Sequence, residues 1–101
     1  MQENLLAYHY FRDVIWGSVM ATVLIRFNGG NVPVLVGAAP STPDEPIANP
    51  TDTGGTANTP FIMAAGTHCF ALQSPTPYRP LWQIGEAIDG TQLRLDFAVV
   101  P

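Results

Sequence analysis

The chain has 101 residues, a length that suits a single domain with its own hydrophobic core. Charged residues make up only 12% of it, lysine is absent, and the formal net charge is −4. Binding to nucleic acid or to an anionic membrane surface needs clustered cations, so this composition argues against both. Cys69 is the only cysteine, which excludes an intrachain disulfide.

The first 18 residues form an aromatic segment, or arm, that we expect to be separate from the domain at residues 19–101. Asn4 fits the cap of a helix, but alternating aromatic and β-branched residues over 8–16 favour a strand. The start of the chain lacks the basic region of a signal peptide, and no apolar run is long enough to span a bilayer. We therefore expect cytoplasmic synthesis, with incorporation into a virion as a further option.

Residues 19–27 alternate between apolar and polar side chains, which predicts a strand with its odd-numbered residues facing inward. The stretch 28–31, Asn-Gly-Gly-Asn, supplies the residues that a tight hairpin turn demands. Residues 32–36 then fit the returning strand. Pro33 places that strand at the edge of a sheet, because proline cannot donate to a central ladder.

Residues 38–60 differ in composition from both flanks, with five prolines and many small polar residues. This composition predicts a long loop that contains neither a helix nor a central strand. Loops of such length are either mobile or functional. The functional hypothesis is an arm that becomes ordered on contact with a neighbouring copy of the chain.

The remainder predicts short strands at residues 61–64, 67–73, 81–88 and 92–99, with a hairpin turn at Asp89-Gly90. The alternation in the last strand points its odd-numbered residues inward and Gln92, Arg94 and Asp96 outward. In the third of these strands, Trp82 alternates with Ile84 and Ile88, which favours a place for all three in the core. The fold class is therefore all-β: an antiparallel immunoglobulin-like β-sandwich or small barrel of six to seven strands, with one long Pro-rich loop.

Turn and strand motifs follow one another in a fixed order between residues 21 and 100. They are Asn28–Asn31, Val34–Gly37, Thr59-Pro60, Ala65–His68, Tyr78–Pro80 and Asp89-Gly90. This order resembles that of the PEGA domain, a small immunoglobulin-like β-sandwich module. The loop at 38–58 is longer than the family's, and residues 1–18 have no counterpart. The resemblance implies a non-catalytic surface or interaction module, with no catalytic residues to carry over.

The residues that bear reactive groups do not form a recognisable catalytic or metal-binding pattern. His68 and Cys69 are adjacent on a predicted strand, so their side chains point to opposite faces and cannot act as a base and nucleophile pair. Paired cysteine and histidine ligands for zinc are missing, and neither glycine pair lies in a phosphate-binding loop. We therefore expect neither an enzyme nor a metal or other cofactor.

The expected function is that of a structural or interaction module that contacts a protein partner or copies of itself. A phage virion protein, such as a capsid decoration protein, is one alternative, and a module that binds carbohydrate or another surface is a second. Aromatic residues anchor interfaces, and prolines limit the entropy that an ordering loop loses. On this basis the interaction residues are expected to be Tyr8, Tyr10, Phe11, Trp16, Pro43, Pro46 and Pro50.

Overall fold

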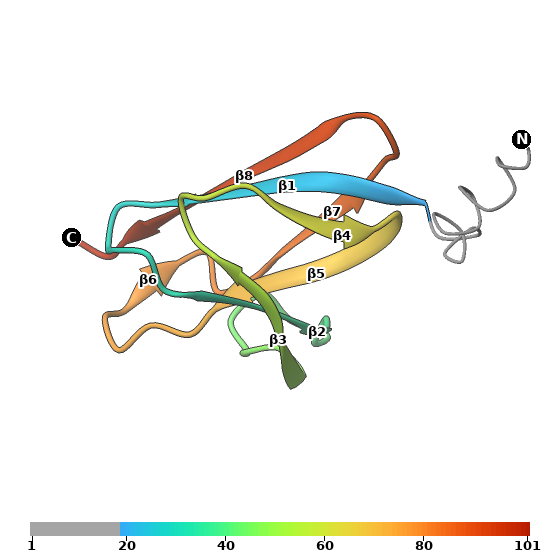
Figure 1. Ribbon diagram of the computed structural model, residues 1–101. Coiled ribbons are helices and arrows are strands. Elements are labelled where there is room, and N and C mark those ends of the chain that lie inside the picture. The colour runs from blue at the N-terminus through green and yellow to red at the C-terminus, as the bar shows by residue number, and fades with distance from the viewer. Residues whose placement is uncertain (1–18) are drawn as a thin grey trace, which may run out of the picture.

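The computed structural model describes residues 19–101, and the regular secondary structure in this range consists of strands alone (Figure 1). The strands are β1 (Met20–Phe27), β2 (Pro33–Ala38), β3 (Ala48–Thr56), β4 (Phe61–Ala64), β5 (Gly66–Leu72), β6 (Tyr78–Arg79), β7 (Gln83–Ala87) and β8 (Gln92–Val99). The predicted N-terminal segment lies outside the described residues, so its conformation stays a prediction.

The strands form two four-stranded sheets that pack in a sandwich-like arrangement, with no closed barrel among the described residues (Figure 1). Sheet I has the order β4-β1-β8-β6, and sheet II has the order β3-β2-β5-β7. The edge position predicted from Pro33 is therefore wrong, because β2 lies between β3 and β5, and proline is tolerated there as the first residue of the strand. All pairs are antiparallel except β1 and β8, which run parallel. The all-β prediction is confirmed for residues 19–101, although they contain eight strands where six or seven were expected. The expected fully antiparallel arrangement is wrong for the pair β1 and β8.

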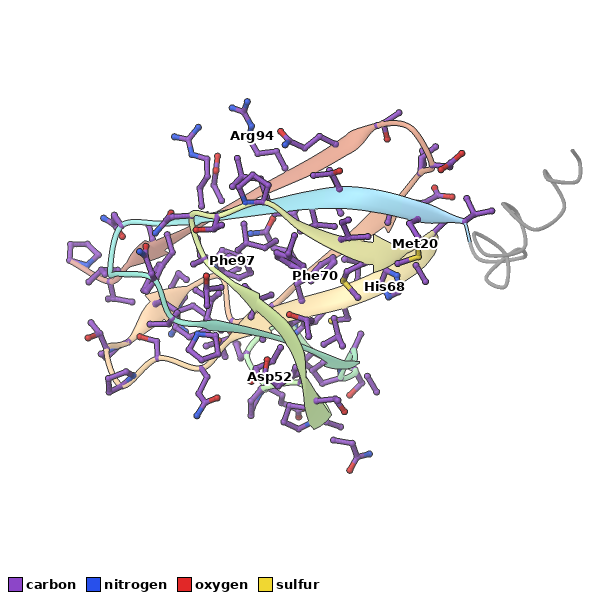
Figure 2. The ribbon with its side chains drawn as sticks, viewed as in Figure 1. Met20, Asp52, His68, Phe70, Arg94 and Phe97 are labelled. Carbon is purple, nitrogen blue, oxygen red and sulfur yellow. The ribbon has the colours of Figure 1, made fainter. Side chains whose placement is uncertain are left out.

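The main core lies between the two sheets and follows the alternation of the sequence. Sheet I contributes the odd-numbered residues of β1 and Phe97 of β8, whereas sheet II contributes Val34, Phe70 and Leu72. Phe70 and Phe97 lie between the two layers in Figure 2. Each buried side chain of this size stabilises the fold by about 1.5–3 kcal/mol relative to an exposed position.

The two predicted hairpin turns exist as turns, but neither forms a hairpin. The turn at Asn28–Asn31 joins β1 of sheet I to β2 of sheet II, and the turn at Asp89-Gly90 joins β7 of sheet II to β8 of sheet I. Gly30 and Gly90 have φ angles of 126° and 82°, as such turns require. Turn residues allow the chain to reverse, but tertiary pairing decides its partner, and both sides of β1 are already paired with β4 and β8.

The prediction that residues 38–60 form one long loop is wrong for its second half, because residues 48–56 form β3 at the edge of sheet II. An edge strand tolerates proline, and the pairing of β3 with β2 shifts register at two places. Asn49 and Gly54 have positive φ angles there, which breaks the regular strand pattern. The true loop is residues 39–47.

The short strand β6 was also missed, and Tyr78 explains its place. The Tyr78 hydroxyl donates to the Leu72 carbonyl oxygen and accepts from the Leu72 amide, both over 3.0 Å. Its ring packs edge-on against Phe27 and Phe97, with centroid distances of 5.9 and 5.7 Å. This one side chain therefore joins the edge of sheet I to the end of β5 in sheet II.

Candidate interaction surfaces

Part of the outer face of sheet II, over β2 and β5, is covered by residues 39–47, which we call the cover loop. Ile47 of this loop is buried together with Cys69 and Ala71 of β5, and half-buried Leu35 and Trp82 complete this second, smaller core. The Trp82 indole Nε1–H donates to the Glu45 carbonyl oxygen over 3.0 Å. The loop is therefore held against its own domain by both apolar packing and a hydrogen bond.

The close approach of the cover loop to sheet II depends on Gly37 of β2. A Cβ atom at Gly37 would lie 2.5 Å from the Ala48 carbonyl oxygen and 3.1 Å from the Ile47 side chain. A separation of 2.5 Å is well inside van der Waals contact, so the backbone would have to move. The chain therefore passes over β2 only because this residue has no side chain.

The three prolines expected to carry interactions are all exposed. Pro43 and Pro46 lie together in the cover loop, and Pro50 lies on β3. The four aromatic interaction residues expected in the N-terminal segment, Tyr8, Tyr10, Phe11 and Trp16, lie outside the described residues. Their part in binding stays a prediction.

The expected core placement of the isoleucines on and after β7 is wrong. Ile84 and Ile88 are 54% and 52% exposed, whereas Gly85 and Ala87 face the interior. Leu93 and Leu95 of β8 fill the space over this strand, and a Cβ at Gly85 would lie 2.7 Å from the Leu93 side chain. Small residues therefore face inward on β7, and the large ones face solvent.

The reactive side chains of the described residues are not brought together. The His68 ring Nε2 lies 2.8 Å from the Ala64 carbonyl oxygen, and Cys69 lies on the opposite face of β5 in the second core. Within residues 19–101, no three potential ligands cluster in a way that would hold a metal ion. Two open depressions of about 460 Å³ each lie beside Asn58 and Asp96 and beside Asp89 and Thr91. The Thr91 hydroxyl in the second one donates to the Ile88 carbonyl oxygen over 2.8 Å.

Cys69 lies behind the cover loop, and burial raises the pKa of its thiol above the ordinary value. The thiolate is the reactive form, so we expect slow labelling by a disulfide reagent at pH 8. The Ile47→Ala variant should react more than about tenfold faster, because losing about 2 kcal/mol of packing raises the population in which the cover loop is detached. Equal rates in the two proteins would show that the loop does not shield the thiol. Ile88→Ala, at an exposed site, is the control.

The raised pKa of Cys69 also sets the direction of a pH effect on stability. A group whose pKa is higher in the folded than in the unfolded state contributes its full stabilisation below the unfolded pKa. That contribution is lost as the pH rises through the folded value. The buried thiol therefore disfavours the folded state in alkaline solution.

In contrast to sheet II, the outer face of sheet I is not covered by any described segment. Even-numbered residues of β1 and β8 point to this face, and parallel pairing sets Leu24 beside Arg94 and Arg26 beside Asp96. The Arg26 Nε and Asp96 Oδ1 atoms are 3.4 Å apart. Ile62 of β4, 63% exposed, adds an apolar side chain to the same face.

Charge is divided between the two sides of the sandwich. The arginines of residues 19–101 are Arg26, Arg79 and Arg94, and all three lie on the outer face of sheet I. The side of sheet II carries Asp44 and Glu45 in the cover loop, Asp52 on β3 and Glu86 on β7. Figure 2 shows Arg94 and Asp52 on opposite sides of the molecule.

The sequence pattern pointed Arg94 and Asp96 outward but did not reveal this division. The signal that was missed is the pairing of β1 with β8, which places Arg26 and Arg94 on neighbouring strands although 68 residues separate them in the chain. No local motif predicts a contact between segments so far apart.

Comparison of the chain with protein-family models, with curated proteins and with solved structures finds no match. A search of residues 19–101 for a helix long and apolar enough to cross a membrane finds none.

Proposed function

We propose that this protein is a non-catalytic interaction module that binds another protein chain through the outer face of sheet I. The observation that carries the proposal is the contrast between the two outer faces. The cover loop packs on β2 and β5 of sheet II, whereas no described segment covers sheet I, which presents its arginines and Ile62 to solvent beside the half-buried Leu24. Arginine is enriched and lysine depleted at protein interfaces, which fits a chain without lysine.

A protein partner suits this domain better than a carbohydrate. Sugar rings stack on exposed aromatic rings, but the six aromatic residues of the described range are buried or half-buried. Trp82 packs in the second core, and its indole Nε1–H donates to the Glu45 carbonyl oxygen. A capsid decoration protein would need the same kind of surface, but no observation on the described residues favours this alternative over other protein-binding modules.

We also propose a fold family for the module, namely that it is immunoglobulin-like and related to the PEGA domain. Its support is the packing of two sheets and the Tyr78 hydroxyl, which bonds back to Leu72 six residues upstream as the tyrosine corner of immunoglobulin-like domains does. The strand orders differ from those of the constant-type immunoglobulin fold, where the first strand pairs with the second. The resemblance is therefore one of architecture.

Photocrosslinking tests the proposed interface in the full chain. A photoreactive residue at Gln92, on the outer face of sheet I, is expected to give adducts with another chain in expressing cells. The same residue at Thr76, an exposed position in the loop between β5 and β6, is the control and should give several-fold fewer. Mass spectrometry identifies the adducts. Equal yields from the two positions would contradict the proposal.

A further inference from the structure

We infer that the partner of the outer face of sheet I is the sheet II side of a second copy of this chain, so that copies associate head to tail. The inference rests on the proposed function and names its partner. Both surfaces belong to one molecule and carry net charges of opposite sign: three arginines and Asp96 on the outer face of sheet I, against four carboxylates on the sheet II side.

The first support is that most of these charges have no partner within the described domain. Among residues 19–101, an ion pair joins only Arg26 to Asp96. No ion pair within these residues involves Arg79 or Arg94 on the basic side. The same holds for Glu45 and Glu86 on the acidic side. A contact between the two sides of different copies would bring these groups together, whereas an isolated copy leaves them separated by both sheets.

The second support is that net charge disfavours the symmetric alternatives. In an isologous dimer the same patch meets itself. Pairing two outer faces of sheet I would set arginine against arginine, and pairing two sheet II sides would set carboxylate against carboxylate. The heterologous contact alone joins faces whose net charges are opposite in sign. Two copies joined by a heterologous contact still have one free surface of each kind, to which further copies can bind. The assembly therefore closes into a ring or forms an open stack, and the length of an open stack grows with concentration.

The contact also has an apolar component on each side. Leu24 and Ile62 lie on the basic face, and Ile84 lies beside Glu86 on the acidic side, 54% exposed. Charge at a protein surface chiefly sets orientation and association rate, while apolar contact adds affinity. The arrangement therefore predicts weak, oriented and salt-sensitive association.

Solution mass against ionic strength is the first part of the test. Light scattering on the full chain should show a mass that rises with concentration at about 0.01 M salt and falls toward that of the monomer at about 1 M, where the Debye length drops from about 30 Å to about 3 Å. A mass that is independent of salt, or that grows with it, would overturn the inference.

Charge reversal is the second part. Arg94→Glu and Glu86→Arg should each weaken self-association by about tenfold or more, because like charges then face one another across the contact. A mixture of equal amounts should recover it, since the acidic side of the first variant fits the basic side of the second. Recovery also shows that both variants fold. Asp89→Arg, in the turn between the sheets, makes the same change in charge as Glu86→Arg and should leave association unchanged.

The outcomes separate this inference from the proposed function. A full chain that stays monomeric at low salt, or two variants whose mixture does not recover association, would overturn the head-to-tail contact. If the photoreactive residue at Gln92 then gave adducts with a different protein, the interaction module would stand with another partner. If neither self-association nor adducts were found, both proposals would be wrong.

Discussion

The Phe70→Ala variant is expected to unfold at a markedly lower urea concentration than the unchanged protein. Phe70 is fully buried at the centre of β5, where it contacts the side chains of both sheets. Removing a buried phenylalanine costs about 3–5 kcal/mol, through lost burial and the cavity left behind. A domain of this kind has a total stability of about 5–15 kcal/mol, so the variant loses a large part of it.

Urea denaturation followed by tryptophan fluorescence measures this loss, because Trp82 packs in the second core on the other face of the same sheet. Ile84→Ala on β7 is the control. It removes an apolar side chain from the same sheet at a position that is 54% exposed, and it should shift the free energy of unfolding by about 0.5 kcal/mol or less. Similar losses in the two variants would mean that the core does not lie between the sheets.

The strands that the sequence predicted best are those with one apolar face and one polar face. In β1 and β8 the alternation gave both the position of the strand and its inward residues, because a period of two suits only one buried face. The same reasoning failed for β7, where Gly85 faces inward. Leu93 and Leu95 of the opposite sheet fill the space next to Gly85, and the sequence of β7 itself does not indicate their presence.

Other parts of the fold depend on contacts that are distant in sequence. The prolines of residues 38–60 correctly excluded a central strand, but β3 exists because β2 offers it an edge. The turn residues at 28–31 correctly marked a reversal but not the change of sheet. The candidate interface has the same origin, since parallel pairing of β1 with β8 assembles it. The aromatic segment at residues 1–18 remains a prediction of the sequence alone.

The second large effect is expected at Asn58, in the turn between β3 and β4. The strand β4 pairs with β1 only from Met20 to Val23, and Asn58 continues the pairing beyond that point. Its backbone amide donates to the Ile25 carbonyl oxygen over 2.6 Å. Its side-chain Oδ1 accepts from the Phe27 amide, and its Nδ2 donates to the Phe27 carbonyl oxygen, each over 2.9 Å. One asparagine thus takes the place of a neighbouring strand.

The same Nδ2 group reaches the turn between the two sheets, at 2.9 Å from Asn31 Oδ1 and 3.3 Å from the Gly30 carbonyl oxygen. Asn58 also has a φ of 71°, in the left-handed region that asparagine tolerates better than other residues with side chains. Substitution therefore removes hydrogen bonds and, unless glycine is introduced, adds backbone strain. These two costs can be separated by choosing the replacement.

Asn58→Ala should lower the free energy of unfolding by about 2–4 kcal/mol, since it leaves the Phe27 backbone groups unpaired and places alanine at a positive φ. Asn58→Gly loses the same side-chain bonds without the strain, so it should recover about 1 kcal/mol of that loss. Asn31→Ala removes one exposed hydrogen bond and should cost about 0.5 kcal/mol. Chemical denaturation of the three variants gives the comparison. If alanine and glycine at position 58 cost the same, strain has no part in the effect; if both matched the unchanged protein, β1 would not need Asn58 to complete its edge.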